Sequence, residues 1–344
     1  MENILKYFKS SKQNFIMWSC AFLFVIISFV LSFFNLGNVV NTDGTESVLS
    51  GIDIIFGSHL NPFILIGWIL LLLGLINSVV MVFWKKSEVL QSFLIIVPIF
   101  LFAFLPQIIN APLAENPEIT KYISVEYTTE LILIVVFLSM SAILYLSINL
   151  DQIRFTTREI CELAMLVGLA VVLNFFPKIP LAWAGSINFQ IVPLVIIALR
   201  FSPFKTFMAS GMIFGLITCF TDGYGLFAFP LEYLVAFGSV AIISIFRKYI
   251  LKIRTEKKGK SYALAILLLM FLILIQTTIR FICASIDSYI FYYAYLDLDS
   301  ASTAFGAALV YNAPYVYLTG LVTMGVVGAL YYPILQINKK FSNN

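Results

Sequence analysis

The chain has 344 residues, of which 61% are hydrophobic and only 11% are charged, and its formal net charge is +3. A water-soluble domain of this length carries about a quarter charged residues, so this chain has too little polar surface to form one. The composition therefore excludes a soluble globular protein and indicates one that is immersed in a lipid bilayer.

The apolar residues form continuous blocks, most of them close to the roughly 20 residues that cross a bilayer as a helix. Lipid offers the backbone no hydrogen bonds, so a spanning segment must be a helix or part of a closed barrel. Continuous blocks lack the alternation of a barrel strand and therefore favour helices. We predict an all-α polytopic membrane protein with about ten transmembrane helices, near residues 15–34, 62–84, 90–109, 131–150, 159–176, 187–200, 204–221, 225–246, 262–283 and 306–335.

The positive charges predict the orientation of these helices. Most of the 21 lysines and arginines fall in alternate loops counted from the N-terminal segment, and the richest of these loops is residues 247–260. Because Lys and Arg are enriched in cytoplasmic loops, we expect a multi-pass protein of the cell membrane with both termini in the cytoplasm. The first block, residues 15–34, is too long for a signal-peptide core and lacks a small-residue cleavage site, so we expect it to be retained.

A polar segment, Asn149 to Ile160, separates the first four predicted helices from the last six. We therefore predict a four-span domain of unknown role, residues 1–150, and a six-span domain, residues 151–344. The first domain has few polar residues inside its helices, which favours a scaffold, although its outer polar loops leave recognition of an external molecule open. The second domain carries polar and charged residues at membrane depth, which are functional pointers in a membrane protein.

Glu232 is the strongest candidate for a binding residue. It lies in FPLEYLVAF, about two turns inside the outer end of the eighth predicted helix. A buried carboxylate is costly unless it is paired or faces a wet cavity. We expect either a ligand with a positive charge or several N–H donors, or a structural ion pair with Arg280. Asn312, near the outer end of the last predicted helix, supplies an amide that both donates and accepts.

Aromatic residues gather at the same outer level. Some of them are expected to form the aromatic belt of the membrane interface. The others are predicted to line a pocket that stacks on a flat ring, including a cationic one. The aromatic residues at this level are Trp183, Tyr224, Tyr233, Tyr289, Tyr292, Tyr293, Tyr311 and Tyr315.

The sequence contains no GxxxxGK[ST], HExxH or GxSxG motif, so we expect neither nucleotide hydrolysis by this chain nor an enzyme. Its four cysteines stand singly and its one histidine, His59, lies in a polar loop, so we expect no metal and no cofactor. Two pairs of small residues, Ala164/Gly168 and Gly211/Gly215, have the spacing that lets another helix approach closely.

Several stretches follow one another in a set order through the six-span part. They are ELAMLVGLAVVLNFFP, Trp183 six residues after Pro177, IVPLVIIALRFSPFKTFMASGMIFGLI, Tyr224, LEYLVAFGSVAIISIFRK and YNAPY. In this order and spacing, residues from about 155 to 340 resemble the substrate-binding S components of energy-coupling factor (ECF) vitamin transporters, most closely the thiamine-specific one. The four N-terminal helices lie outside the resemblance.

The resemblance implies roles for single residues in a binding pocket. Glu232 and Tyr233 match the family's Glu-Tyr pair, whose carboxylate holds the aminopyrimidine ring of thiamine. The other pocket positions are occupied by Trp183, Tyr224, Asn312 and, where the family has a stacking tryptophan, Tyr292.

The resemblance also implies a docking face, and it has departures. Ala164 and Gly168 fall on the family's Ala-x-x-x-Ala motif, which packs on the coupling helices of a transmembrane partner subunit. A pocket histidine of the family is replaced by Ala284, a pocket tyrosine by Ala307, and an acidic residue by Asn188. These losses bear on the choice of vitamin more than on the class of protein.

The implied function is the substrate-binding membrane subunit of an ECF-type ABC importer for a vitamin, and thiamine is the first candidate for that vitamin. Its partners would be the lipid bilayer, a transmembrane coupling subunit and two ATPase subunits, which use the ATP; no nucleic acid is expected. One alternative is an S component for another vitamin or precursor, whose carboxylate or phosphate would meet Arg280. Another is a stand-alone secondary transporter, which predicts ion-driven uptake without an ATPase.

Overall fold

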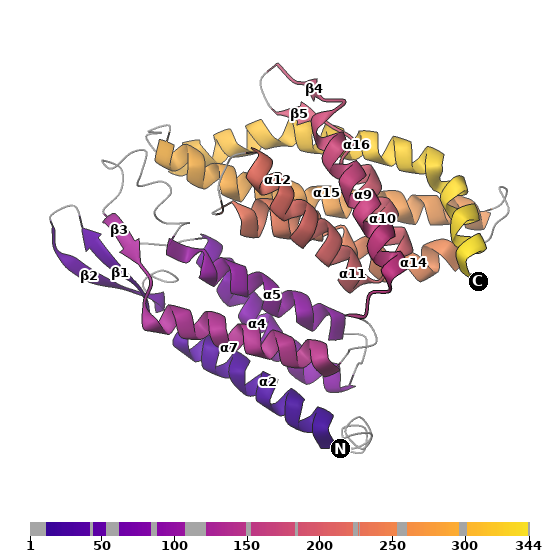
Figure 1. Ribbon diagram of the computed structural model, residues 1–344. Coiled ribbons are helices and arrows are strands. Elements are labelled where there is room, and N and C mark those ends of the chain that lie inside the picture. Colours follow the sequence, from indigo (N-terminus) through magenta and orange to yellow (C-terminus); the bar gives the residue numbers. More distant parts are fainter. Residues whose placement is uncertain are drawn as a thin grey trace. The chain divides into compact units, whose positions relative to one another are not determined.

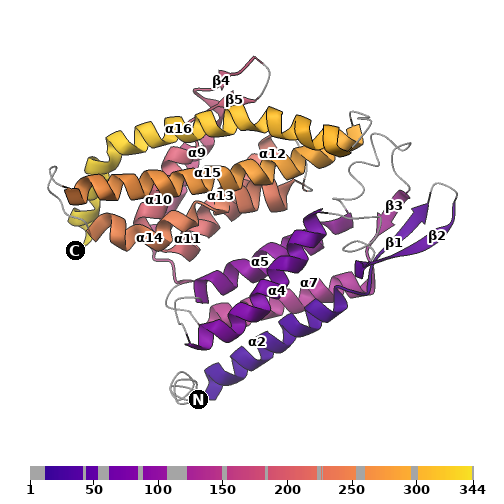
Figure 2. The same cartoon turned by 180° about the vertical axis from the view of Figure 1, so that it is seen from behind.

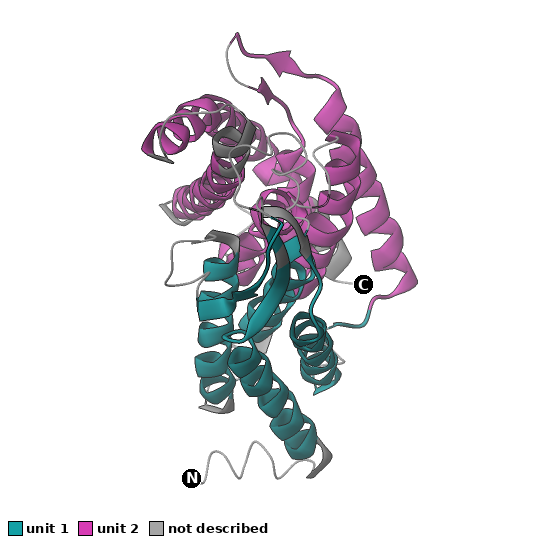
Figure 3. Ribbon diagram, turned by 90° about the vertical axis from the view of Figure 1, so that its left-hand side faces the viewer, with its two compact units in different colours: residues 1–154, 294–297 teal, residues 155–293, 298–344 magenta. Residues whose placement is uncertain are grey.

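The computed structural model describes residues 12–41, 44–52, 62–83, 88–106, 122–148, 153–182, 185–222, 226, 228–252, 260–295 and 301–342. The chain divides into two compact units, which Figure 3 shows in different colours. Unit 1 comprises residues 1–154 with 294–297, and unit 2 comprises residues 155–293 with 298–344.

The expectation of a polytopic α-helical membrane protein is confirmed. Within the described residues, seven helical segments are long and apolar enough to cross a membrane. The other three predicted segments form two shorter apolar helices, Leu90–Ala103 and Ile191–Arg200, and the helix α9, Thr157–Phe175. The seven segments are Asn14–Leu31, Ile64–Met81, Thr129–Ile148, Pro203–Asp222, Phe229–Leu251, Tyr262–Tyr289 and Ser302–Gln336.

Unit 1 contains a bundle of long apolar helices. Its helices α2 and α7 run antiparallel, because Ser141 of α7 donates to the Ala21 carbonyl of α2 and the Phe24 and Phe137 rings stack with centroids 5.5 Å apart. Helix α5 packs between α4 and α7 (Figure 1). The four helices are α2 (Lys12–Leu31), α4 (Pro62–Phe83), α5 (Glu88–Ala103) and α7 (Thr129–Ile148).

A buried polar network joins the four helices of unit 1 at Ser78. Gln91 Nε2 donates to Ser78 Oγ at 2.7 Å, and the Tyr145 hydroxyl lies 2.9 Å from the same oxygen. Trp18 Nε1 donates to the Ser78 carbonyl at 3.3 Å, and Asn77 Nδ2 donates to Gln91 Oε1 at 2.8 Å. Between apolar helices in lipid, such hydrogen bonds hold the bundle together because the hydrophobic effect does not.

A small antiparallel sheet accompanies this bundle, and the sequence did not predict it. Its strands are β1 (Asn35–Asn41), β2 (Glu46–Ser50) and β3 (Tyr122–Glu126), in the order β2-β1-β3. Val39 pairs with Ser47 on one side and with Val125 on the other. The polar loops of the first domain therefore contain regular structure beside the membrane helices.

Unit 2 contains the remaining helices and a short hairpin. Two of its membrane segments include a π-helical stretch: α11, η2 and α12 form one segment, and η3, α13 and α14 form the next. The helices are α9 (Thr157–Phe175), α10 (Ile191–Arg200), α11 (Pro203–Phe207), η2 (Met208–Phe214), α12 (Gly215–Asp222), η3 (Phe229–Val235), α13 (Ala236–Gly238), α14 (Ala241–Lys252), α15 (Lys260–Tyr295) and α16 (Ala301–Ser342), and the hairpin pairs β4 (Ile179–Pro180) with β5 (Ser186–Ile187).

The two longest helices, α15 and α16, lie side by side and antiparallel (Figures 1 and 2). The Tyr262 and Tyr331 rings meet at a centroid distance of 5.5 Å near one end of the pair. Further along, the Phe281 and Tyr317 rings meet at 5.2 Å. The pair forms a long wall of unit 2.

Helix α10 lies in the core of unit 2. It packs against α9, α14 and α16, and nearly all its residues are buried. Its ten residues rise only about 15 Å, which is half of the hydrocarbon thickness. The short sixth apolar block of the sequence is therefore a buried half-length helix.

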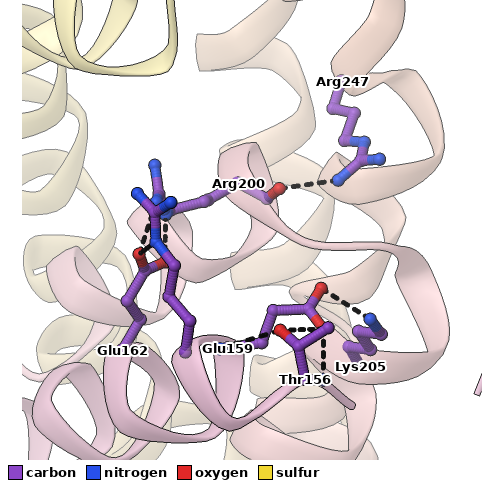
Figure 4. Close-up of polar contacts among 7 residues, drawn as sticks. Thr156, Glu159, Glu162, Arg200, Lys205 and Arg247 are labelled. Atoms are coloured by element: carbon purple, nitrogen blue, oxygen red, sulfur yellow. Dashed lines mark hydrogen bonds and ion pairs between the residues drawn. The ribbon is translucent and has the colours of Figure 1, made fainter. Parts of the chain in front are cut away.

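Ion pairs tie α9 to its neighbours at the N-terminal end of α9 (Figure 4). Glu162 accepts from Arg200 at the end of α10, with distances of 2.6 and 2.7 Å. Glu159 pairs with Lys205 of α11 at 2.6 Å and forms a capping box with Thr156. A capping box satisfies backbone N–H groups that a helix start leaves free, so this end of α9 is fixed in place.

Candidate functional site

Unit 2 encloses a cavity of about 450 Å³ at the opposite, C-terminal end of α9. This volume lies within the range of small-molecule binding sites. Lys178 and Asp222 are exposed and mark its mouth, while Asp287 and Gln190 are buried in its wall. The lining residues are Asn174, Phe175, Lys178, Gly185, Ser186, Asn188, Gln190, Thr221, Asp222, Glu232, Tyr233, Phe237, Arg280, Asp287, Ser288, Tyr311 and Tyr315.

The π-helix η3 carries Glu232 and Tyr233 into this wall. It packs closely on η2 and α12 through two glycines. A Cβ added at Gly211 would lie 2.7 Å from the Leu234 carbonyl oxygen, and one at Gly215 would lie 3.1 Å from that of Tyr233. The small-residue pair therefore allows the backbone that directly follows Glu232 to approach η2 and α12. Short π-helical stretches occur frequently at functional sites.

Three carboxyl groups line the cavity. Glu232 on η3 and Asp287 on α15 both line it, and their carboxyl groups are close enough to interact electrostatically. The Tyr233 hydroxyl donates to Asp222 Oδ2 at 3.1 Å. Carboxyl groups gathered in one enclosed site favour an occupant that carries positive charge or hydrogen-bond donors.

Two basic residues balance part of this charge. The Arg280 guanidinium lies over the Phe237 ring, 5.1 Å from its centroid. Among the residues that the structure describes, no ion pair joins Arg280 to Glu232. The expected alternative, a structural ion pair between these two residues, is therefore not formed, and Arg280 and Glu232 both line the cavity. Lys178 supplies the second basic group, at the mouth.

Amide side chains form another part of the wall. Asn188 Nδ2 donates to Asn174 Oδ1 at 3.2 Å. Within the described part of the chain, Asn188 Oδ1 and Gln190 Oε1 are buried and have no donor. Asp287 Oδ1 is likewise buried and has no hydrogen-bond donor. Sequence reasoning assigned no role to Asn174 or Gln190, since an amide next to an apolar block carries no distinctive signal.

Asn312 is buried behind the cavity wall. Its Nδ2 donates to the Ala308 carbonyl and the Ser288 hydroxyl, at 2.8 and 2.9 Å. The Tyr315 hydroxyl donates to Asn312 Oδ1 at 2.6 Å, and Tyr315 lines the cavity. In this structure Asn312 holds Tyr315, and direct contact between Asn312 and a ligand stays a prediction.

Tyr315 is also held from the hairpin side. Gly185 has a φ of +47°, a conformation that L side chains rarely adopt, and a Cβ there would lie 2.8 Å from the Tyr315 ring. The backbone at Gly185, just before β5, can therefore lie directly on this ring. The aromatic residues that line the cavity are Phe175, Tyr233, Phe237, Tyr311 and Tyr315.

Three of the predicted pocket residues are not placed by the structure. Trp183 and Tyr224 lie outside the described residues. Tyr292 belongs to α15, but its side chain lies outside what the structure describes. The structure thus brings Glu232 and Tyr233 together in one cavity, places Asn312 behind it, and leaves the roles of the other three as predictions.

The two predicted docking residues lie on an exposed face of α9. Ala164 and Gly168 are both exposed within unit 2, and no atom lies within 4 Å of a Cβ built on Gly168. Met165 and Val172 nearby are 68% and 58% exposed. The face is apolar, so lipid or another helix can cover it.

The replaced family positions have structural roles here. Ala284 is buried and its carbonyl accepts from Asn312 Nδ2, so this stretch of α15 packs closely on α16. Ala307 is half-buried on α16. Asn188 remains in the cavity wall. One turn beyond Ala284, Asp287 adds a carboxyl group that the sequence-based prediction did not include among the binding residues.

A cavity with polar, charged and aromatic walls inside a polytopic helical membrane protein suits a membrane transport protein that binds a small molecule. Residues 160–339 match the family model described as Thiamine transporter protein (Thia_YuaJ), which covers just over half of the chain. The chain belongs to this family of thiamine transporters, and the recognition made from the sequence is confirmed. No curated protein and no solved structure matches the chain.

Proposed function

We propose that this protein is the substrate-binding subunit of an ECF-type importer and that it binds thiamine in the cavity of unit 2. One observation carries the proposal: Glu232 and Asp287 both line a cavity with aromatic walls, inside the segment that matches the family. Thiamine combines an aminopyrimidine, which has N–H donors, with a positively charged thiazolium ring. The carboxyl groups of the cavity can accept from the first ring, and the carboxyl and aromatic groups can attract the charge of the second.

The chemistry of binding follows from the side chains. Glu232 accepts hydrogen bonds from the aminopyrimidine, in the role that the resemblance assigns to it. Tyr311 and Tyr315 offer ring faces for stacking and for cation–π contact with the thiazolium. The predicted contributions of Trp183, Tyr224 and Tyr292 would add further aromatic surface.

The test of the binding site is the affinity of the purified protein for thiamine. The Glu232→Gln variant keeps the shape of the side chain and removes its charge, and we expect thiamine to bind at least tenfold more weakly, about 1.4 kcal/mol. Glu130→Gln, the same change in the first turn of α7 in unit 1, is the control and should leave affinity unchanged. Equal affinities of the two variants would refute the site.

Transport would be driven by other subunits. We propose that the exposed α9 face around Ala164 and Gly168 docks on a transmembrane coupling subunit, which two ATPase subunits serve. The support is the exposed apolar face of α9, whose N-terminal end the Glu159 and Glu162 ion pairs hold. This face would lie toward the cytoplasm at its N-terminal end, with the cavity toward the outside.

Gly168→Leu tests the docking face. The added side chain projects into open space within unit 2, so folding and thiamine binding should be retained while co-purification of the coupling and ATPase subunits is lost. Met165→Leu is the control, because it nearly conserves the side-chain volume at the position next to Ala164, and this variant should keep the complex. If the unsubstituted protein takes up thiamine without any ATPase-bearing partner, the secondary transporter is the correct class.

A different vitamin or precursor remains the second candidate, because Arg280 lines the cavity without a carboxylate partner among the described residues. A ligand carboxylate or phosphate would pair with it. Thermal stabilisation of the purified protein by a panel of vitamins separates the two candidates, since a ligand stabilises in proportion to the logarithm of its concentration over its Kd. Stabilisation by an anionic vitamin at lower concentrations than thiamine would favour the second.

A further inference from the structure

The carboxyl group of Asp287 is the least satisfied acidic group of the cavity. Asp287 is only 4% exposed, and within the described residues its Oδ1 has no hydrogen-bond donor. A buried acceptor without a donor costs free energy, and for a carboxylate the cost is larger. Asp287 nevertheless lies in the cavity wall beside Glu232. An occupant of the cavity is therefore the natural source of the missing donor.

The neighbouring wall has the same deficit. Asn188 Oδ1 and Gln190 Oε1 are also buried acceptors without a donor, and both residues line the same cavity. The other buried unpartnered atoms described in unit 2 are the hydroxyls of Ser202, Ser285 and Thr319, and none of these residues lines the cavity. Hydroxyls can also donate, whereas the amide and carboxyl oxygens described in unit 2 as buried without a donor all line the cavity. They point to a ligand rich in N–H or O–H groups.

The position of Asp287 determines which part of such a ligand it meets. Both Asp287 and Glu232 line the same cavity, and their carboxyl groups are close enough to interact electrostatically. Arg280 lies seven residues earlier, two turns along the same face of α15, and also lines the cavity. If Glu232 holds the aminopyrimidine, Asp287 lies within reach of the same ring.

We infer that Asp287 is a further ligand-binding residue, which accepts a hydrogen bond from the exocyclic amino group of the pyrimidine and selects for ligands that carry this group. The inference rests on the proposed binding of thiamine. A pyrimidine with a carbonyl oxygen in place of the amino group would bring an acceptor against the carboxylate and would be rejected. Asp287 would thus recognise the amino group from a position one helical turn beyond Ala284, where the family has its pocket histidine.

The test compares two ligands on the purified full-length protein: thiamine and its analogue with a 4-oxo group in place of the 4-amino group. The unsubstituted protein should prefer thiamine. In Asp287→Asn an amide can donate to the carbonyl oxygen, so thiamine should bind at least tenfold more weakly while the oxo analogue binds equally or better. The ratio of the two dissociation constants should therefore fall at least tenfold.

Two comparison variants separate this role from others. Asp222→Asn removes the same charge from the same cavity, and its effect should be similar for both ligands, since Asp222 is occupied by the Tyr233 hydroxyl. Ser285→Ala changes α15 away from the cavity and should leave the ratio unchanged. A loss in Asp287→Asn that is equal for both ligands, or no loss, overturns the inference. If the unsubstituted protein binds neither ligand, the proposed function fails instead.

Discussion

The amide of Asn312 is fully engaged inside unit 2, where it connects α15 to α16. It donates to Ser288 and to backbone carbonyls, and it accepts from Tyr315. A polar side chain in this position affects a ligand through the ring that it holds. This makes Asn312 a positioning residue in the structure, whatever further contact a bound ligand adds.

Replacing Asn312 by alanine should lower both stability and affinity. The change removes the hydrogen bonds between the two helices and leaves the Tyr315 hydroxyl without its acceptor, so we expect a loss of about 1–2 kcal/mol in the free energy of unfolding. Tyr315→Phe should reproduce most of the loss in thiamine affinity, with a smaller loss in thermal stability. Full affinity in Tyr315→Phe beside a large loss in Asn312→Ala would instead show that Asn312 contacts the ligand.

Single residues of the site were predictable from sequence only where they break an apolar pattern. Glu232 stands out because it interrupts the block FPLEYLVAF, and the cavity contains it. Asp287 lies close to the polar outer loop, where an acidic residue is ordinary. Gln190 and Asn174 become meaningful only because the fold buries their side chains at one cavity, which spacing along the chain cannot reveal.

At the scale of elements, the contact between η2 and η3 positions the acidic wall. A Cβ at Gly211 would lie 2.7 Å from the Leu234 carbonyl oxygen and 3.0 Å from the Gly238 Cα, and both are backbone atoms that cannot rotate away. The two segments can therefore approach closely only with glycine at this position. Glu232 lies on η3, so its placement depends on that approach.

Gly211→Ala should separate η2 from η3. We expect a loss of about 1–3 kcal/mol in the free energy of unfolding, as is usual for overpacking, together with weaker thiamine binding. Gly325→Ala on α16 is the matched control, because a Cβ there meets no atom within 4 Å and the change should leave both quantities the same or slightly improve stability. Thermal unfolding in detergent and titration calorimetry measure the two effects. Unchanged affinity in a destabilised Gly211→Ala protein would show that the contact does not position Glu232.

Elements were predictable from sequence where the signal is local. The membrane helices follow from apolar blocks, and all ten predicted segments are helical among the described residues. The sheet of unit 1 was missed because β1 and β3 are short and lie more than 80 residues apart in the chain. A pairing of this kind is determined by how the helices bring their ends together. The π-helical stretches η2 and η3 likewise have no periodic signature that separates them from α-helix.

At the scale of the whole molecule, the two units differ in how their buried polar groups are hydrogen-bonded. Unit 1 has a buried network around Ser78 whose polar groups satisfy one another. In unit 2 the described residues form a cavity with unsatisfied acceptors. The first arrangement stabilises a bundle, whereas the second requires an occupant. This contrast supports the interpretation of unit 1 as a scaffold.

Gln91→Leu tests this division of roles in the full-length chain. The Gln91 side chain donates to Ser78 Oγ and to the Gly74 carbonyl and accepts from Asn77. Because the variant removes these hydrogen bonds, we expect the free energy of unfolding to fall by about 1–2 kcal/mol. Thiamine affinity should not change, because the residues that line the cavity belong to unit 2. A tenfold change in affinity would contradict a scaffold role and would show that unit 1 takes part in binding.

The orientation of the molecule in the membrane gives the last prediction. The positive-inside rule predicts that the end of unit 2 that contains Arg200, Lys205 and Lys248 lies in the cytoplasm and that the mouth of the cavity lies outside. In a variant without native cysteines, Lys178→Cys should react with a membrane-impermeant thiol reagent on intact cells, and thiamine should slow the reaction because Lys178 lines the cavity. Lys248→Cys, also an exposed position, should react only after the cells are permeabilised. The reverse pattern would place the cavity on the cytoplasmic side, and a binding subunit that captures its vitamin from the medium could not work in that orientation.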